Sequence, residues 1–317
     1  MKIIHTVESY YPEINGMAEV VRQLSERLVL LGHDVTVVTR KIEERKSTLI
    51  NGVKVKEFSI QGSWVNGITG DRKAYEHFLL ADDFDILTNF ACQHWMTDVA
   101  LPLLPRLKAK KVFVPTGLSG LMWKEYDDYY KQMETWMRAY DMTVFLSDNY
   151  RDINFAKKIG ITKRCIIPNG AAEDEFLSPD KTDIRKKLGI KEDEFFILHV
   201  GAYTGIKGHA EAIRIYLKSK IKKSVMVFIA FKQEEFVKYT KFNKRFFLWK
   251  LLNFFPQKKY IITLLNRQDT VAAHKAADLF LFPSQIECSP IVLFEAMAGK
   301  TPFLSTDVGN VREIIEW

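Results

Sequence analysis

PSQIECSPIVLFEAMAGKTPFLSTDVGN, residues 283–310, is the most informative stretch of this chain. Ser289-Pro290 predicts a helix N-cap followed by proline at the first helical position, and Gly299 predicts the end of that helix. The apolar run just before this stretch, Leu279–Phe282, is typical of a buried strand. Together these features predict a strand, a loop and a helix in succession.

The same alternation of strand and helix extends outward in both directions. The expected strands are residues 2–7, 34–39, 53–58, 85–88, 111–114, 143–146 and 165–167, followed by 195–200, 225–230, 260–264, 279–282 and 301–305. Such alternation predicts an α/β fold with two doubly wound, mainly parallel sheets of the Rossmann-like type. We place the boundary after Pro168-Asn169-Gly170, which gives domains 1–170 and 171–317.

The loops that follow the strands are the expected places for ligands. Ligands bind beyond the carboxyl ends of parallel strands, and two such sheets facing each other make a cleft. The candidate loops are residues 8–16, 89–97, 115–120, 201–208 and 283–290. After the first of these loops a helical period predicts an apolar helix face that includes Val21, Leu24 and Leu31.

The composition narrows the class of protein. The 317 residues are 47% hydrophobic and 27% charged, which is ordinary for a soluble globular protein. No stretch approaches the roughly 20 apolar residues of a membrane span, and we expect no secretory leader. Three separated cysteines and seven isolated histidines predict reduced thiols in the cytoplasm and no transition-metal site. The net charge of +7 favours anionic ligands.

The helix after Pro290 suggests a nucleotide site. Its first free amides, from Ile291 and Val292, would bind an anion. Glu295 lies about five residues into the helix, roughly 7.5 Å along the axis, where its carboxylate could accept two ribose hydroxyls. Glu287 lies in the preceding loop. The alternative is a capped helix with two incidental glutamates, but Glu295 has apolar neighbours and a buried carboxylate needs a partner.

Two loops supply further candidates. Lys207 stands between Gly205 and Gly208, after an expected strand, and its ammonium could neutralise a diphosphate as negative charge develops. Alternatively, it is a solvated surface lysine. Asn15-Gly16 ends the first loop, and small residues there let a ligand approach the backbone closely; a plain tight turn is the alternative.

Three features concern other partners. His94, in NFACQHW, is either a cleft residue or a packed histidine. The basic, aromatic stretch KYTKFNKRFFLWKLLNFFPQKK, residues 238–259, either contacts an anionic membrane or packs its apolar residues inside the protein. Residues 205–208 match the GxxG pattern of an RNA-binding module. In that module the GxxG loop joins two helices, whereas residues 205–208 follow an expected strand. We therefore expect no nucleic-acid partner.

Four segments together resemble a known family. Glu287 and Glu295 form an ExxxxxxxE pattern that resembles the signature of the retaining nucleotide-sugar glycosyltransferases of family 4. Residues 8–39, 165–176 and 200–213 resemble the N-terminal loop and helix, the entry to the second domain and the phosphate-binding loop of that family. The resemblance implies the GT-B architecture, two Rossmann-like domains around a cleft. It also implies a nucleoside-diphosphate sugar as co-substrate, with no metal and no cofactor.

The resemblance also implies roles for the candidate residues. Glu295 would hold the ribose, while Lys207 and the amides of Ile291 and Val292 would hold the diphosphate. Glu287 would contact the sugar or stabilise positive charge developing on it. The Asn15-Gly16 loop would come near the donor phosphates and the acceptor.

This chain departs from the family pattern in three places. Many relatives carry an arginine where this chain has Ala202 and Tyr203, and a histidine in the loop that corresponds to residues 114–120. Relatives also continue with further helices beyond the position of Trp317, so the second domain is expected to be incomplete.

The function expected on this basis is retaining transfer of a hexosyl-type sugar from a nucleoside-diphosphate sugar to an acceptor hydroxyl. We expect the acceptor to be a glycan or lipid-linked molecule in cell-surface glycan or glycolipid synthesis. The expected location is the cytoplasm, with peripheral contact to the inner face of the cell membrane as a further hypothesis. Two alternatives stay open: a non-catalytic nucleotide-sugar-binding or partner subunit, and a nucleotide-sugar epimerase of the same architecture.

Overall fold

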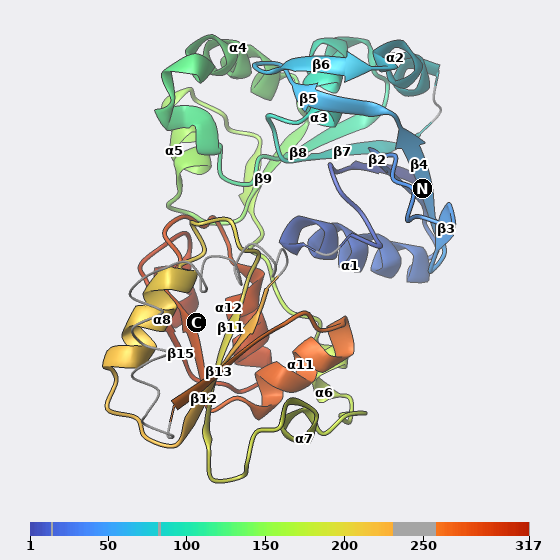
Figure 1. Ribbon diagram of the computed structural model, residues 1–317. Coiled ribbons are helices and arrows are strands. Elements are labelled where there is room, and N and C mark those ends of the chain that lie inside the picture. The colour runs from blue at the N-terminus through green and yellow to red at the C-terminus, as the bar shows by residue number, and fades with distance from the viewer. Residues whose placement is uncertain (14, 82–83, 231–257, 317) are drawn as a thin grey trace. The chain divides into compact units, whose positions relative to one another are not determined.

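The chain forms two units, each built on its own parallel sheet. Figure 1 shows the computed structural model, which describes residues 1–317 apart from 14, 82–83, 231–257 and 317. The units are Met1–Pro168 and Asn169–Trp317. Each has the mixed α/β composition expected from the sequence, so the predicted fold class is confirmed. The basic stretch 238–259 lies outside the described residues apart from its last two.

The first unit contains an eight-stranded sheet in the order β10-β9-β8-β7-β1-β2-β4-β3. All neighbouring pairs are parallel except β3 and β4. The strands are β1 (Lys2–Thr6), β2 (Asp34–Arg40), β3 (Leu49–Ile50), β4 (Val53–Phe58), β7 (Ile86–Phe90), β8 (Lys110–Val114), β9 (Met142–Phe145) and β10 (Arg164–Ile166). The chain runs outward from β1 through β2 in one direction and from β7 through β8 in the other. The order therefore reverses between β1 and β7, which is where open α/β sheets bind ligands.

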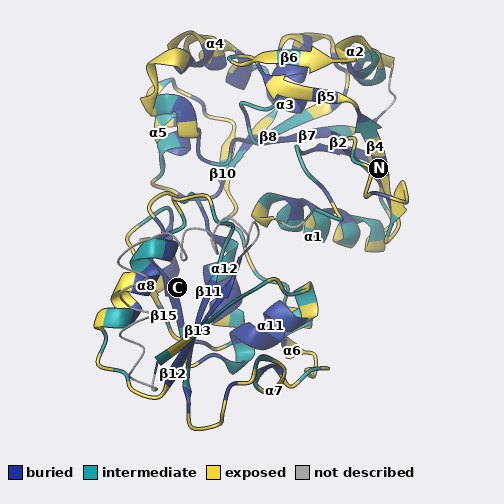
Figure 2. Cartoon of the chain, viewed as in Figure 1, coloured by how far each residue is buried: buried dark blue, intermediate teal, exposed yellow. Residues whose placement is uncertain are grey.

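Helices, short 3₁₀ segments and a two-stranded hairpin surround this sheet. The helices are α1 (Gly16–Leu30), α2 (Arg72–Ala81), α3 (Trp95–Ala100), α4 (Asp127–Arg138) and α5 (Arg151–Lys158); the 3₁₀ segments are η1 (Leu101–Arg106), η2 (Ser119–Met122) and η3 (Lys124–Tyr126); the hairpin is β5 (Ile60–Ser63) with β6 (Gly67–Gly70). Figure 2 shows the central strands buried and the outer faces of the helices exposed. None of the described helices is long and apolar enough to cross a bilayer.

The buried face of helix α1 agrees only in part with the predicted one, because Val21 is buried as expected but Leu24 and Leu31 are not. Ala18, Val21 and Ser25 are buried, whereas Leu24 and Leu31, expected on the apolar face, are 41% and 73% exposed. The reason is a polar contact in the core, because Ser25 Oγ shares a 2.9 Å hydrogen bond with Nδ1 of His5 in β1. A serine on the buried side is invisible to a search for apolar periodicity.

The buried imidazole of His5 predicts a pH-dependent stability. Burial lowers the pKa of His5 from 6.5 to about 4. The unfolded chain therefore takes up this proton first, and stability is lost as the pH falls from 6.5 towards 4. With about 1.4 kcal/mol per pKa unit, this group accounts for about 3 kcal/mol in total. We expect urea unfolding at pH 7, 6 and 5 to show a flatter pH profile for His5→Gln than for the wild type.

A histidine on the surface supplies the control. His77, exposed on α2, is replaced in the same way, and His77→Gln should retain the pH profile of the wild type. Comparing variants with the wild type cancels the contribution of all other titrating groups. Parallel profiles for His5→Gln and the wild type would contradict the prediction.

The second unit contains a five-stranded, wholly parallel sheet in the order β13-β12-β11-β14-β15. Its strands are β11 (Phe195–Val200), β12 (Ser224–Ile229), β13 (Lys258–Thr263), β14 (Leu279–Phe282) and β15 (Phe303–Ser305); its described helices are α6 (Glu173–Leu177), α7 (Ile184–Leu188), α8 (His209–Lys218), α11 (Arg267–Ala276), α12 (Ile291–Ala298) and α13 (Val311–Glu316). The strand order reverses between β11 and β14. The loops that follow these two strands are therefore the expected ligand loops of this unit.

Candidate functional site

Lys207 and Glu287 meet beyond the carboxyl ends of β11 and β14. Lys207 Nζ lies 2.7 and 2.8 Å from the two carboxylate oxygens of Glu287. Ser284 Oγ donates a further hydrogen bond of 2.7 Å to the same carboxylate. The Glu287 side chain is 9% exposed and that of Lys207 is 28% exposed. The structure thus brings together the two residues that the sequence singled out as catalytic candidates.

The two loops that carry this ion pair are packed directly on each other. Gln285 N donates to Ile206 O at 2.8 Å, and Ser284 Oγ lies 3.2 Å from the same carbonyl oxygen. Gly208 has a φ of +73°, and a Cβ atom there would lie 1.9 Å from Pro283 O. Only glycine therefore lets the loops approach this closely.

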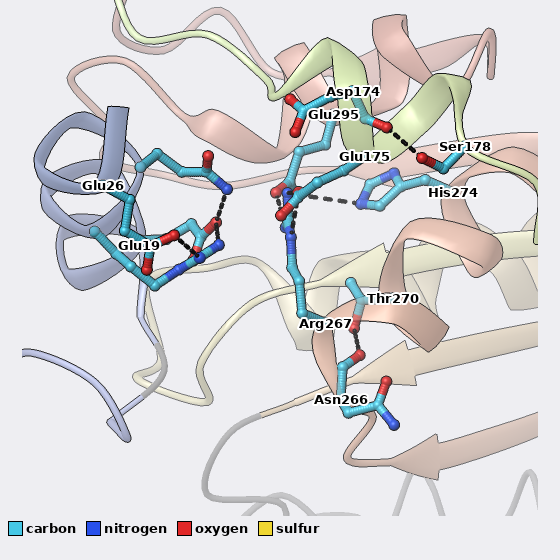
Figure 3. A network of polar contacts seen from close by, with 12 residues as sticks. Glu19, Glu26, Asp174, Glu175, Ser178, Asn266, Arg267, Thr270, His274 and Glu295 are labelled. Carbon is cyan, nitrogen blue, oxygen red and sulfur yellow. Dashed lines mark hydrogen bonds and ion pairs between the residues drawn. The ribbon is translucent and has the colours of Figure 1, made fainter. Parts of the chain in front are cut away.

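Glu295 lies in a second polar cluster, on α12. Its side chain is 4% exposed and forms an ion pair with Arg267 Nη1. His274 Nε2 lies 3.5 Å from the other carboxylate oxygen. Arg267 in turn donates to Glu175 Oε2 at 2.9 Å from Nε and 2.6 Å from Nη2 (Figure 3). Burial alone would raise the pKa of Glu295, but the hydrogen bonds and charges of His274 and Arg267 outweigh it and lower that pKa.

Sequence reasoning missed the partners of Glu295. It required a partner for a buried carboxylate without locating one, and Arg267 stands 28 residues before Glu295. Arg267 opens α11, whose N-cap is Asn266, and His274 lies in the last turn of the same helix. The two side chains reach Glu295 only because α11 packs against α12. No local pattern indicates that packing.

The start of α12 differs from the prediction in one respect. Pro290 itself occupies the N-cap position, and no side chain caps the helix. Ser289, predicted as the cap, instead accepts hydrogen bonds from Asn310 Nδ2 at 3.0 Å and Asn169 N at 3.4 Å. Because Ser289 is engaged elsewhere, the half-buried Ile291 and Val292 present the first amides of the helix at its positive end.

Asn15 and Gly16 lie in the first unit, at the start of α1. Asn15 is the N-cap: its Oδ1 accepts from Ala18 N at 2.9 Å, and its Nδ2 donates to Ser9 Oγ at 2.6 Å. Gly16 is the first residue of the helix and is exposed. Asn15 was predicted as a loop or turn residue, and the structure shows that it also caps helix α1.

Comparison with known proteins identifies the family. A family model described as Glycosyltransferase Family 4 matches residues 14–175, and one described as Glycosyl transferases group 1 matches residues 180–316. The chain belongs to glycosyltransferase family 4. Both polar clusters of this glycosyltransferase lie almost wholly within the second matched region.

Individual relatives agree with this assignment. An uncharacterized glycosyltransferase of Methanocaldococcus jannaschii is 26% identical over 100% of this chain and 83% of its own length. The alpha-monoglucosyldiacylglycerol synthase of Streptococcus pneumoniae is 24% identical over 96% of this chain and 71% of its own length.

Solved structures show the fold. Sucrose-phosphate synthase of Thermosynechococcus elongatus is 16% identical, with a TM-score of 0.73 over 98% of this chain and 82% of its own. HepE of Anabaena, solved with UDP and glucose, is also 16% identical, with a TM-score of 0.71 over 100% of this chain and 83% of its own. The likeness places the glycosyltransferase among proteins of the GT-B fold.

The chemistry open to the site follows from its charges. Lys207 offers an ammonium group beside a carboxylate, α12 offers free amides, and Glu295 offers a charged hydrogen-bond acceptor. The ammonium and the amides can bind an anion, and the carboxylate of Glu295 can accept hydrogen bonds from a diol. Among the residues that the structure describes, no group of three or more His, Cys, Asp or Glu is arranged to hold a metal ion.

The close packing of the two loops gives a second prediction. Gly208→Ala forces a left-handed backbone on alanine and a clash with Pro283 O, so we expect it to lower the free energy of unfolding by at least about 2 kcal/mol. Gly205→Ala is the matched control, because Gly205 has a φ of +82° but open space at the Cβ position. That variant should lose only about 1 kcal/mol. Urea unfolding measures both, and equal losses would show that the loop approach is unimportant.

Proposed function

We propose that this glycosyltransferase is a retaining enzyme that moves a hexosyl-type sugar from a nucleoside-diphosphate sugar to an acceptor hydroxyl. The observation that carries the proposal is the Lys207–Glu287 ion pair, which lies where the strand order of the second sheet reverses. A cation at that point suits the diphosphate of a donor. The HepE structures that resemble this chain contain UDP or UDP-glucose.

The proposed donor site uses both polar clusters. Glu295 would accept hydrogen bonds from the ribose hydroxyls, because it is charged and held in place by Arg267 and His274. The amides of Ile291 and Val292 would bind the phosphate oxygens. The proposal includes no metal ion, because Lys207 and these amides supply positive charge for the leaving group.

The proposed reaction exchanges one bond at the anomeric carbon for another on the same face. The bond from that carbon to the diphosphate oxygen breaks, and the acceptor oxygen forms the new bond. The leaving phosphate takes the proton of the acceptor hydroxyl. Lys207 would stabilise the negative charge on the leaving group, and Glu287 the positive charge that develops on the sugar.

We further propose a role in the synthesis of cell-surface glycans or glycolipids, in the cytoplasm and in peripheral contact with the membrane. Support comes from two relatives named for such products. One is the diacylglycerol glycoside synthase of Streptococcus pneumoniae, and the other is the lipopolysaccharide glucosyltransferase WaaG of Escherichia coli, 30% identical over 45% of this chain and 37% of its own length.

The test is thermal unfolding of the full chain with UDP-, GDP- and ADP-sugars, followed by product analysis. A donor at 100 times its dissociation constant should add about 2.7 kcal/mol of stability. Once an acceptor that the enzyme uses has been found, NMR of the product should show that the transferred sugar keeps the anomeric configuration it had in the donor. Inversion would overturn the retaining mechanism. A stability increase without transfer to any acceptor would favour the nucleotide-sugar-binding subunit instead.

A further inference from the structure

A cavity of about 230 Å³ lies within the first unit, beyond the carboxyl ends of β7 and β8. Its walls come from residues 91–94, which follow β7, and from six residues that follow β8, namely Pro115, Thr116, Leu118, Ser119, Trp123 and Tyr126. β7 is also the strand at which the sheet order reverses. The cavity therefore lies where an open α/β sheet binds a ligand, and it is formed without any residue of the second unit.

Backbone strain is concentrated in the walls of this cavity. Ala91, Gln93, Thr116 and Leu118 have φ angles of 62°, 63°, 58° and 46°. Seven non-glycine residues in the described part of the chain have a positive φ angle, and four of these seven line this cavity. Each such residue costs about 1 kcal/mol or more. Strain of this kind persists where the surroundings enforce it, and it gathers at functional sites.

Buried carboxylates hold the strained loops in place. Asp98 Oδ1 accepts a hydrogen bond of 2.6 Å from Tyr129 Oη. Tyr129 Oη in turn accepts a hydrogen bond of 3.1 Å from the backbone N–H of Gln93. Asp152 Oδ2 accepts from Gly117 N at 2.9 Å. Asp98 and Asp152 are 1% and 0% exposed. These buried hydrogen bonds hold the loops in their strained conformation, which is the arrangement expected of a binding site.

The lining combines an aromatic ring with uncharged polar groups. Trp123 is 51% exposed and lies against Tyr126, with ring centroids 5.9 Å apart. Gln93, Thr116 and Ser119 contribute an amide and two hydroxyls. An aromatic face beside a few polar groups suits the C–H face and the hydroxyls of a sugar ring.

The charges around the cavity disfavour an anion. Every residue of its lining is described, and none is lysine or arginine. Burial lowers the pKa of His94, which disfavours a positive charge on this imidazole. The carboxylate of Glu8 lies 3.7 Å from His94 Nδ1 and would repel a phosphate or a second carboxylate.

We propose that this cavity binds a neutral sugar ring, so that the acceptor is the hydroxyl of an uncharged glycoside. The inference rests on the proposed transfer reaction and names the chemical class of its acceptor. It also gives His94 and the loop 115–120 a shared role as walls of an acceptor site. Trp123 supplies the surface on which the ring of the glycoside packs.

Ligand-observed NMR on the full chain tests the proposal. The probes are the methyl glycosides of glucose, galactose, mannose and N-acetylglucosamine, with methyl glucuronide and inorganic phosphate as anionic counterparts. We expect at least one neutral glycoside to bind and both anions to bind at least tenfold more weakly. Trp123→Ala should weaken the neutral glycoside about tenfold, and Trp123→Phe should restore most of that loss.

A second exposed tryptophan in the same unit supplies the matched control. Trp64 is 40% exposed and packs on Trp136, outside the cavity, so Trp64→Ala should bind the glycoside as the wild type does. The proposal is overturned if no neutral glycoside binds, if an anion binds as tightly, or if Trp64→Ala causes the same loss as Trp123→Ala.

Measuring the nucleotide-induced rise in stability on the same sample distinguishes a failure of the acceptor proposal from a failure of the proposed donor site. A nucleotide effect without glycoside binding would reject the acceptor proposal alone. Glycoside binding without a nucleotide effect would support the sugar site and reject the proposed donor site.

Discussion

Lys207→Ala is expected to lower kcat for sugar transfer by about two to three orders of magnitude, the loss typical of removing one preorganised group that stabilises developing negative charge. The ammonium is held at one point by both oxygens of Glu287 and by the packing of its own loop on residues 283–287. Without this ammonium, less positive charge is available to stabilise the diphosphate as it leaves the sugar. Steady-state kinetics with the donor identified by thermal unfolding measure the effect.

Removing Lys207 also leaves a buried carboxylate without its cation, so stability has to be controlled. Lys259 forms an equivalent pair with Glu194, whose side chain is 8% exposed against 9% for Glu287. Glu194 immediately precedes β11 and so lies at the opposite end of that strand from Lys207. Lys259→Ala should lower stability to a similar extent and retain kcat. A similar loss of kcat in both variants would mean that destabilisation, and not the lost charge at the site, causes the effect.

Glu295→Ala is expected to raise KM for the donor about 100-fold. A hydrogen bond to a charged group contributes about 1.5–3 kcal/mol, and the proposed site has two such bonds from the ribose. Glu295→Gln keeps the shape and one acceptor oxygen, so its KM should fall between those of the wild type and the alanine variant. Initial rates at varied donor concentration, together with direct titration of the nucleoside diphosphate, give both values.

The polar cluster around Arg267 allows direct contact to be separated from an indirect effect. Besides Glu295, Arg267 forms an ion pair with Glu175, whose carboxylate oxygen lies 2.6 Å from Arg267 Nη2. Glu175 is not part of the proposed ribose contact. Glu175→Ala loosens Arg267 and leaves Glu295 in place, so we expect a change in KM of less than about threefold. A change as large as that of Glu295→Ala would show that Glu295 acts by positioning Arg267.

Much of the second unit could be predicted from the sequence because its signals are local. The strand predicted at 195–200 is β11, and Gly299 ends the helix that follows Pro290, as expected. An apolar run or a helix-ending residue affects the secondary structure only of the residues a few positions away along the chain. The prediction failed where a distant residue intervened: Ser289 bonds to Asn310 instead of capping α12, and Ser25 turns α1 towards His5.

The sequence by itself determined the alternation of strands and helices, the α/β class, and the loops in which Lys207, Glu287 and Glu295 stand. These follow from spacing along the chain, which is a property of the sequence alone. Only the tertiary structure decided that Lys207 meets Glu287 across 80 residues and that Arg267 is the partner of Glu295. It also decided that two strained loops enclose a cavity beyond β7 and β8. The physical reason is that such contacts depend on strand order and helix packing, which arise from the burial of the whole core and not from any local pattern.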